Sequence, residues 1–200
     1  LCQMVKLISN GKPFKMSKRS GDFVTLSEMV DQVGSDSIRF MMLYRKNEAP
    51  LEFDFQKVTE QSKDNPVFYV QYAHARISSV INKLKKTNMN IDLTNFDNCN
   101  FSLLDKEGEI ELIKILLDWK GVIETAVKLY EPHRISYYLY DLSSSFHSLW
   151  NQGKIDKNNK FIDEERPEIS NVRIALLIAT QETLKSGLSL IGVSAPDEMQ

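Results

Sequence analysis

Hydrophobic residues recur at helical spacing along most of the chain beyond residue 65. In the first such segment, one apolar face is formed by Val70, Ala73, Ile77, Val80, Ile81 and Leu84. Asn65 is a favourable N-cap residue and Pro66 a favourable first helical residue, so the helix is expected to begin there. Lys85 and Lys86 suit the negative end of a helix dipole, and they predict that the helix ends close to them.

The same periodicity predicts further helices toward the C-terminus. Two apolar stripes before Pro132 are separated by Gly121, which is expected to soften the join between them. The next segment is periodic as far as Trp150, and Ser170 is expected to cap the last long helix. Residues 56–200 are therefore predicted to form an all-helical bundle of about five helices.

The beginning of the chain shows a shorter and different pattern. Imperfect alternation leads into Asn10 and Gly11, and this pair is the strongest two-residue signal for a β-hairpin. Thr25 and Glu28 then form a capping-box pattern, which opens a short helix that Gly34 ends. A second short helix is expected directly afterwards.

Residues 51–55 alternate between apolar and acidic side chains, which fits either a short strand or an extended connector. We place the domain boundary after them. The predicted fold class is mainly α: a small α+β stem segment, consisting of a hairpin plus two helices, occupies residues 1–55, and the all-helical bundle occupies residues 56–200.

Composition supports a globular chain without covalent staples. Hydrophobic residues make up 42%, and ten Phe, seven Tyr and two Trp supply a sizeable core. Cys2 and Cys99 stand alone, without companions at metal-ligand spacing, so we expect two reduced thiols and no metal site. No segment is long and apolar enough to span a bilayer, and no signal peptide opens the chain. We therefore expect a cytoplasmic protein with no membrane partner.

The charge distribution argues against a general-purpose nucleic-acid binder. The formal net charge is -2. Residues 1–50 hold eight Lys and Arg against five Asp and Glu, a net of +3, whereas the remaining residues hold seventeen against twenty-two, a net of -5. RNA binding by the acidic part must therefore depend on local patches and base contacts.

One short stretch carries candidate chemistry: Lys15-Met16-Ser17-Lys18-Arg19-Ser20-Gly21. Its cations can bind phosphate oxygens, its hydroxyls can donate hydrogen bonds, and its glycine permits unusual backbone conformations. A mobile loop that closes over polyphosphate has this composition. A short basic run that is merely solvated surface has it too, and charge alone leaves both interpretations open.

The sequence of this stretch resembles the KMSKS signature of class I aminoacyl-tRNA synthetases, with Arg19 at the position where the signature has its last serine. Longer runs resemble arginyl-tRNA synthetases in particular: residues 21–26, residues 64–76 and the tail from Gly187 to Met199. Asp36-Ser37-Ile38-Arg39 resembles the Asp-Ala-Leu-Arg run at which synthetase bodies join their helical domains. The resemblance spans nearly the whole chain.

This resemblance implies the C-terminal part of an arginine–tRNA ligase, with the signature loop, a stem and a helical anticodon-binding domain. The expected reaction consumes ATP, accompanied by Mg²⁺, and attaches arginine to its tRNA. Lys18 is the expected catalytic cation on the ATP phosphates, supported by Lys15, Ser17 and Arg19. The chain lacks the His-x-Gly-His half of such an active site and opens with leucine. We therefore expect it to be part of a longer enzyme and to be inactive alone. We also expect that enzyme to be a monomer.

The resemblance also implies tRNA contacts, which we expect at Gln71, His74, Arg76, Tyr137, Arg173 and Met199. For His74 and Arg76 the alternative is a pair of polar positions that border a core face. Tyr137 lies off the apolar stripe on which Tyr138 and Trp150 are expected to pack, so it is the better candidate for base stacking.

Two other functions remain open from the sequence. The chain could be part of another class I synthetase, such as the cysteinyl or methionyl enzyme, because these share the loop and a helical C-terminal domain. It could also be a non-enzymatic helical module that binds RNA or protein and whose basic loop is incidental.

Overall fold

The computed structural model describes residues 4–9, 11–13, 24–46, 48–89 and 91–199. The basic loop that holds Lys15, Ser17, Lys18 and Arg19 lies outside these described residues, as does Cys2. The strands are β1 (Val5–Ser9), β2 (Lys12–Pro13) and β3 (Leu51–Asp54). The α-helices are α1 (Leu26–Val33), α2 (Ser35–Leu43), α3 (Pro66–Leu84), α4 (Glu107–Leu129), α5 (His133–Ile155) and α6 (Pro167–Leu190). The short 3-10 helices are η1 (Lys57–Thr59), η2 (Phe101–Leu103) and η3 (Lys157–Asn159).

The strands form a small sheet in the order β2-β1-β3. β1 pairs antiparallel with β2, which confirms the predicted hairpin, and parallel with β3, where Val5 lies opposite Leu51. The alternating residues 51–55 therefore contain a strand and not merely a connector. Leu51 and Phe53 are both buried because alternate side chains of a strand point to the same face.

The two short helices connect this sheet to the rest of the molecule. The capping box that begins α1 is present: the Thr25 amide donates to Glu28 Oε2 at 2.6 Å, and the Glu28 amide donates to Thr25 Oγ1 at 3.2 Å. Helix α2 contributes side chains to two hydrophobic cores. Ile38 packs into the small core of the sheet, whereas Phe40 is fully buried in the core of the bundle.

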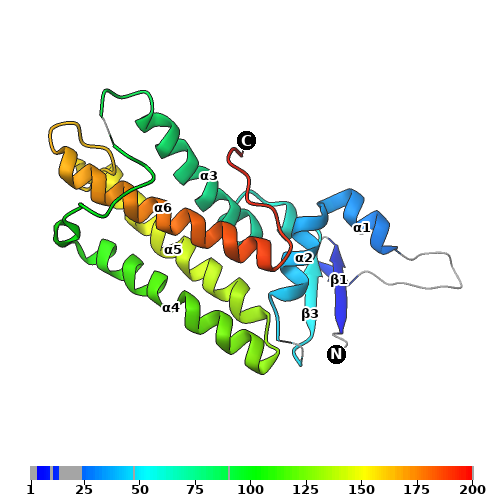
Figure 1. Cartoon of the computed structure of the whole chain (residues 1–200). Coiled ribbons are helices and arrows are strands. Elements are labelled where there is room, and N and C mark those ends of the chain that lie inside the picture. The colour runs from blue at the N-terminus through cyan, green and yellow to red at the C-terminus, as the bar shows by residue number, and fades with distance from the viewer. Residues whose placement is uncertain (1–3, 10, 14–23, 47, 90, 200) are drawn as a thin grey trace, which may run out of the picture.

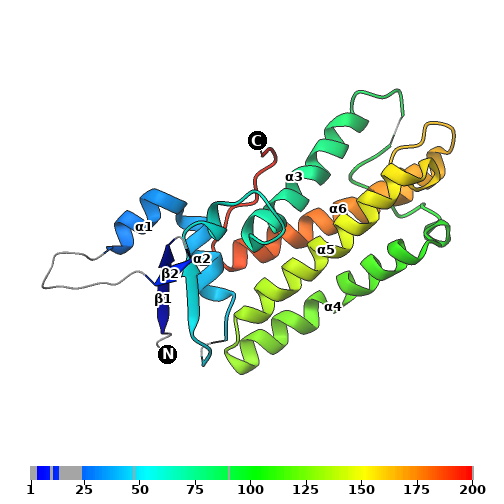
Figure 2. The same ribbon diagram turned by 180° about the vertical axis from the view of Figure 1, so that it is seen from behind.

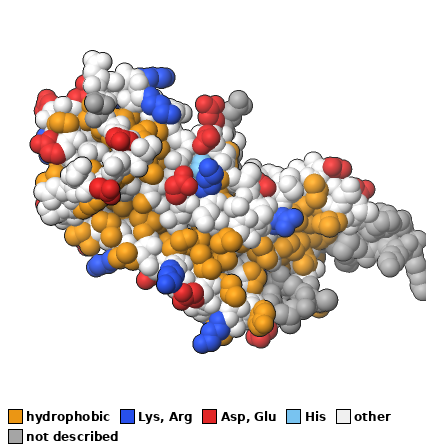
Figure 3. Space-filling view, in the orientation of Figure 1, with side chains coloured by type: hydrophobic (Ala, Val, Ile, Leu, Met, Phe, Trp, Pro, Cys, Tyr) orange, Lys and Arg blue, Asp and Glu red, His pale blue; other side chains and the backbone are white. Residues whose placement is uncertain are grey.

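The long helices α3, α4, α5 and α6 form the bundle, which confirms the mainly α fold class. Helix α5 packs against α3, α4 and α6, and Figures 1 and 2 show α3 and α4 on opposite sides of it. Leu139, Leu142 and Phe146 on α5 are fully buried at the centre. Helix α4 leaves part of its apolar surface uncovered at Leu117 and Val127, and Figure 3 shows hydrophobic side chains gathered along that lower side of the molecule.

The sequence-based helix assignment was wrong at two points. Helix α4 runs unbroken through Gly121, so the described part of the bundle has four long helices instead of about five. Gly121 is exposed, with open space around its missing Cβ, and its backbone stays helical. Ser170 does not cap α6, because that helix begins at Pro167. The Ser170 hydroxyl instead accepts a hydrogen bond from the Asp163 amide at 2.7 Å and thereby fixes the preceding loop.

A buried ion pair joins α4 to α6. Arg173 Nε lies 2.6 Å from Glu109 Oε1, and each side chain is only 2% exposed. Arg173 Nη1 also donates to the carbonyl oxygens of Asn158 at 2.7 Å and Lys160 at 2.8 Å, so the guanidinium group is well supplied with acceptors. Arg173, which the sequence suggested as a tRNA contact, therefore has an internal structural role and presents no surface to a nucleic acid.

We predict that Glu109→Gln destabilises the fold by about 3–5 kcal/mol, because it leaves the buried Arg173 charge without its counterion. Denaturant unfolding of the chain measures this loss. Glu111→Gln, an exposed position on the same helix, is the matched control and should change the free energy of unfolding by less than about 0.5 kcal/mol. Equal unfolding midpoints for the two variants would contradict the prediction.

Candidate nucleic-acid interface

A hollow of about 1140 Å³ lies between α3, the end of α5 and the C-terminal tail; we call it the α3–tail hollow. Its helical walls carry aromatic and basic side chains, and the tail contributes residues 197–199. The aromatic and basic members are Tyr72, Trp150, Arg76, Lys83, Lys86 and Lys154. The acidic members are Asp197 and Glu198. The hollow is therefore locally basic although the bundle as a whole is acidic.

One wall of the hollow carries part of a stack of flat groups that the periodicity of α3 creates. Phe68, Tyr72 and Arg76 are spaced four residues apart, so they lie above one another on one face. The Phe68 and Tyr72 rings are stacked with centroids 5.4 Å apart, and the Arg76 guanidinium lies 4.2 Å from the Tyr72 centroid. It also lies 5.3 Å from the ring of Trp150, which α5 supplies. Unpaired bases stack on such aromatic and guanidinium surfaces.

His147 of α5 holds the Arg76 guanidinium in place through a hydrogen bond. Its Nε2 lies 3.2 Å from the Tyr69 carbonyl oxygen and its Nδ1 lies 3.1 Å from Arg76 Nη1. A carbonyl can only accept and a guanidinium can only donate, so this network requires the neutral imidazole with its proton on Nε2. Desolvation by burial lowers the pKa of His147 to about 4, which keeps the ring neutral near physiological pH.

The tail forms its wall of the hollow because it is bound along α3. Gln71 Nε2 donates to the Ser194 carbonyl at 3.0 Å, and the buried His74 donates from Nδ1 to the Pro196 carbonyl at 2.9 Å. One turn further, the Ser78 hydroxyl donates to Asp197 Oδ1 at 2.8 Å. The tail therefore follows three successive turns of the helix before it enters the hollow.

The start of the tail is also tied to the stem. Asp36 Oδ2, at the beginning of α2, accepts from the Ser194 amide at 3.1 Å, from the Ser194 hydroxyl and from Gln71 Nε2 at 2.9 Å. Arg39 of the same helix packs against Gly192, whose φ of +69° and missing Cβ allow this close approach. The two charged residues of the Asp-Ser-Ile-Arg run, Asp36 and Arg39, thus contact the same corner of the tail.

The structure brings together two of the six residues suggested as tRNA contacts, Arg76 and Met199, in the α3–tail hollow. Gln71 and His74 border it indirectly, as anchors of the tail. Tyr137 lies elsewhere: it makes an edge-to-face contact with Tyr44 at 5.0 Å, in a separate depression between α4 and α5.

Sequence reasoning missed Tyr72 as a stacking residue. It expected Trp150 to pack in the core, and the Trp150 ring does pack against Phe146 and Phe161. Trp150 is only half-buried and reaches the hollow. The spacing of Tyr72, four residues before Arg76, was the available signal. Nothing in the linear pattern showed that Trp150 would lie beside that pair.

Within the described ranges, no group of three or more His, Cys, Asp or Glu side chains is placed to hold a metal ion. The described helices also include none that is long and apolar enough to cross a membrane. The α3–tail hollow is lined by aromatic rings and by guanidinium and ammonium groups, on which unpaired bases and phosphates can bind.

A helical bundle with an aromatic and basic hollow beside its tail defines a class of nucleic-acid-binding domain, and sequence comparison gives the family. The pattern of the DALR anticodon binding domain matches residues 70–199. The chain therefore belongs to the DALR anticodon binding domain family.

Curated relatives and solved structures extend the likeness to the whole chain. The chain is 55% identical to an arginine–tRNA ligase of Beijerinckia indica and 52% identical to one of Rhizobium rhizogenes, and in both cases all of it aligns with 34% of the relative. A Campylobacter jejuni protein described as an arginyl-tRNA synthetase superposes with a TM-score of 0.77 at 31% identity. The superposition covers all of this chain and 40% of that one. The Thermus thermophilus arginyl-tRNA synthetase gives 0.67 at 26% identity, covering 91% and 29%. These comparisons confirm the resemblance to arginyl-tRNA synthetases, and the chain spans about a third of the length of the curated relatives.

We predict that Asp36→Asn loosens the tail, because three donors converge on one carboxylate oxygen and the variant removes its charge. Hydrogen bonds to charged groups contribute about 1.5–3 kcal/mol, so the Ser194 amide should exchange its hydrogen at least about 10-fold faster. Hydrogen exchange followed by NMR measures this. Asp31→Asn, on the exposed side of α1, is the control and should leave Ser194 unchanged. Equal protection in both variants would contradict the role of Asp36.

We predict that burial of neutral His147 makes the fold sensitive to acid. The unfolded chain binds this proton near pH 6.5 and the folded chain only near pH 4, so stability falls as pH decreases through this window, by up to about 3 kcal/mol. Urea unfolding of the wild type and of His147→Gln between pH 4 and pH 7 isolates the contribution. The glutamine amide can donate to Tyr69 and accept from Arg76 without titrating. Parallel pH profiles for the two proteins would contradict the prediction.

Proposed function

We propose that this chain is the tRNA-recognition part of an arginine–tRNA ligase and that the α3–tail hollow receives unpaired bases of the anticodon loop. The observation that carries the proposal is the stack of Tyr72, Arg76 and Trp150 in an open, locally basic hollow. Base stacking on such surfaces contributes about 1–3 kcal/mol per base. Met199, at the tail side of the hollow, offers a soft sulfur against which a base can pack.

Local charge supports RNA as the ligand despite the overall charge of -2. Four basic side chains face the hollow against two acidic ones. Phosphates of a bound loop therefore meet a positive local field, whereas a duplex laid along the acidic remainder of the bundle would not. Recognition of a single-stranded loop fits this distribution, because the bases supply most of the contact.

The activity of the whole enzyme belongs to the same proposal and is supported by the names of the curated relatives. In it, ATP with Mg²⁺ activates arginine, and the arginyl group passes to an arginine-accepting tRNA. Lys18 acts as the catalytic cation on the ATP phosphates, with Lys15, Ser17 and Arg19 as further phosphate contacts. Residues 1–55 form the loop and stem of the catalytic body and residues 56–200 the anticodon-binding domain of a monomeric, cytoplasmic protein.

In this reaction the protein mainly has to position the reactants and neutralise negative charge. The arginine carboxylate attacks the α-phosphate of ATP and pyrophosphate leaves, so the enzyme must align the reactants and neutralise developing negative charge. A fixed cation such as the one proposed at Lys18 does this without accepting or donating a proton.

The test is binding of arginine-accepting tRNA and of a tRNA with a different anticodon, compared for the wild type and Arg76→Gln. We expect the wild type to prefer the arginine tRNA and the variant to bind it about 5- to 150-fold more weakly, which corresponds to the loss of one stacked base. Fluorescence titration at fixed salt measures both affinities. The titration is made with this chain and with any longer polypeptide that carries it.

Lys128→Gln is the matched control, because it removes one exposed positive charge on α4, which lies on the other side of α5 from α3. It should leave tRNA affinity within about 2-fold of the wild type, since it lies outside the interface. Equal binding of both tRNAs by the wild type, or equal affinities of the two variants, would favour a helical module without anticodon recognition.

A further inference from the structure

A second hollow, of about 860 Å³, adjoins the first where α3 and α5 end and the turn η3 begins. We call it the lysine hollow after four of its lining residues, Lys83, Lys154, Lys157 and Lys160. The two hollows share Lys83, Trp150 and Lys154 as a common wall. An RNA strand that leaves the stacking surface of the α3–tail hollow can therefore reach the lysine hollow without crossing the body of the bundle.

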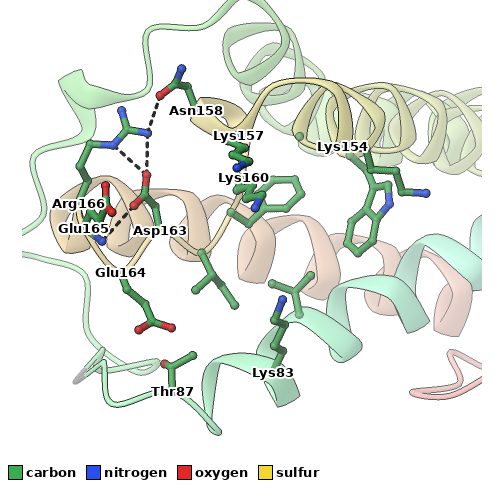
Figure 4. A pocket seen from close by; sticks show the side chains of 15 residues that line it. Lys83, Thr87, Lys154, Lys157, Asn158, Lys160, Asp163, Glu164, Glu165 and Arg166 are labelled. Atoms are coloured by element: carbon green, nitrogen blue, oxygen red, sulfur yellow. Dashed lines mark hydrogen bonds and ion pairs between the residues drawn. The ribbon is translucent and has the colours of Figure 1, made fainter.

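Figure 4 shows how these lysines are arranged. Lys157 and Lys160 lie together on the turn, Lys83 faces them from α3, and Lys154 reaches out from α5. Across the part of the chain that the structure describes, none of these four ammonium groups forms an ion pair. Four cations that line one hollow without internal counterions leave a positive field, which an external polyanion can satisfy.

Acidic side chains limit this field to one end of the hollow. Asp163, Glu164 and Glu165 line the far end, where Arg166 pairs with Asp163 at 2.7 Å. The remaining carboxylates repel phosphate there. An anionic strand is consequently guided along the lysine end, next to Trp150, and not across the whole hollow.

The lysine turn is built on a fixed support. Gly153 allows it to fold back on α5, because a Cβ at that position would lie only 2.9 Å from the Asn159 carbonyl oxygen. From the interior, Arg173 holds the carbonyl oxygens of Asn158 and Lys160, and Glu109 holds Arg173. Because the turn is held at its backbone, binding does not have to order the backbone there, and the entropy cost is limited to the lysine side chains.

We propose that the lysine hollow is a phosphate-binding site for the RNA strand whose unpaired bases occupy the α3–tail hollow. This inference rests on the proposed function, since it takes the same RNA as its ligand. It assigns the backbone contacts to Lys83, Lys154, Lys157 and Lys160, whereas the stacking residues contact bases. Arg173 serves the site as a positioning residue, through the backbone of the turn, and does not touch the RNA.

The test compares Lys157→Gln/Lys160→Gln with Lys114→Gln/Lys128→Gln, a control pair that removes two exposed charges from α4. The probe is the anticodon stem-loop RNA of an arginine-accepting tRNA, titrated at several salt concentrations. Each lost phosphate contact reduces the magnitude of the slope of log affinity against log salt concentration by about 0.7. At 0.1 M salt this corresponds to a loss of affinity of about 5-fold. We expect the turn variant to lose about 1.4 in slope and about 25-fold in affinity, with the control unchanged.

Arg76→Gln, measured alongside, separates failure of this inference from failure of the proposed function. If Arg76→Gln weakens binding while the turn variant keeps the wild-type affinity and salt slope, the phosphate site is overturned and the base-stacking interface stands. Equal losses in the turn variant and the α4 control also overturn it, because they show an effect of overall charge. If Arg76→Gln binds like the wild type, the proposed function itself fails, and the lysine hollow fails with it. Circular dichroism of each variant confirms that the bundle remains folded.

Discussion

The attachment of the C-terminal tail to α3 and α2 is the constraint on which the interface depends. Asp36 gathers the Ser194 amide, the Ser194 hydroxyl and Gln71 on one carboxylate oxygen, and His74 then holds the Pro196 carbonyl. Without these bonds residues 194–199 would lose conformational entropy on ordering with few apolar contacts in return. The bonds hold it, so its last residues form a wall of the α3–tail hollow. The same carboxylate belongs to the helix that joins the stem sheet to the bundle.

A second constraint acts from inside the bundle. Glu109 and Arg173 are almost completely removed from water, and such a pair is tolerated only when its remaining hydrogen-bonding capacity is used. Arg173 uses it on two backbone carbonyls of the turn that carries Lys157 and Lys160. The requirement to satisfy a buried charge thereby fixes a surface feature, and the interior of the bundle determines where exposed cations stand.

Much of the fold could be predicted because its signals are local. Helix α3 has a capping residue, a proline at its first position and a regular apolar stripe, and it begins where the sequence indicated. The errors came where one residue type is compatible with two different local structures. Gly121 was expected to soften the join between two apolar stripes but is an exposed glycine within a continuous helix, and Ser170 looked like a cap but bonds to a loop. Propensity cannot separate these cases, because tertiary contacts decide them.

The sequence by itself determined the helical bundle, the hairpin and the capped first stem helix, because hydrophobic periodicity and capping act over a few residues. It also indicated Arg76 and Met199 through resemblance. Only the tertiary structure decided that Trp150 lines a hollow, that Arg173 is internal and that the lysines at positions 83 and 157 face each other. These residues are far apart in the chain, and their proximity depends on how helices pack, which no local pattern records.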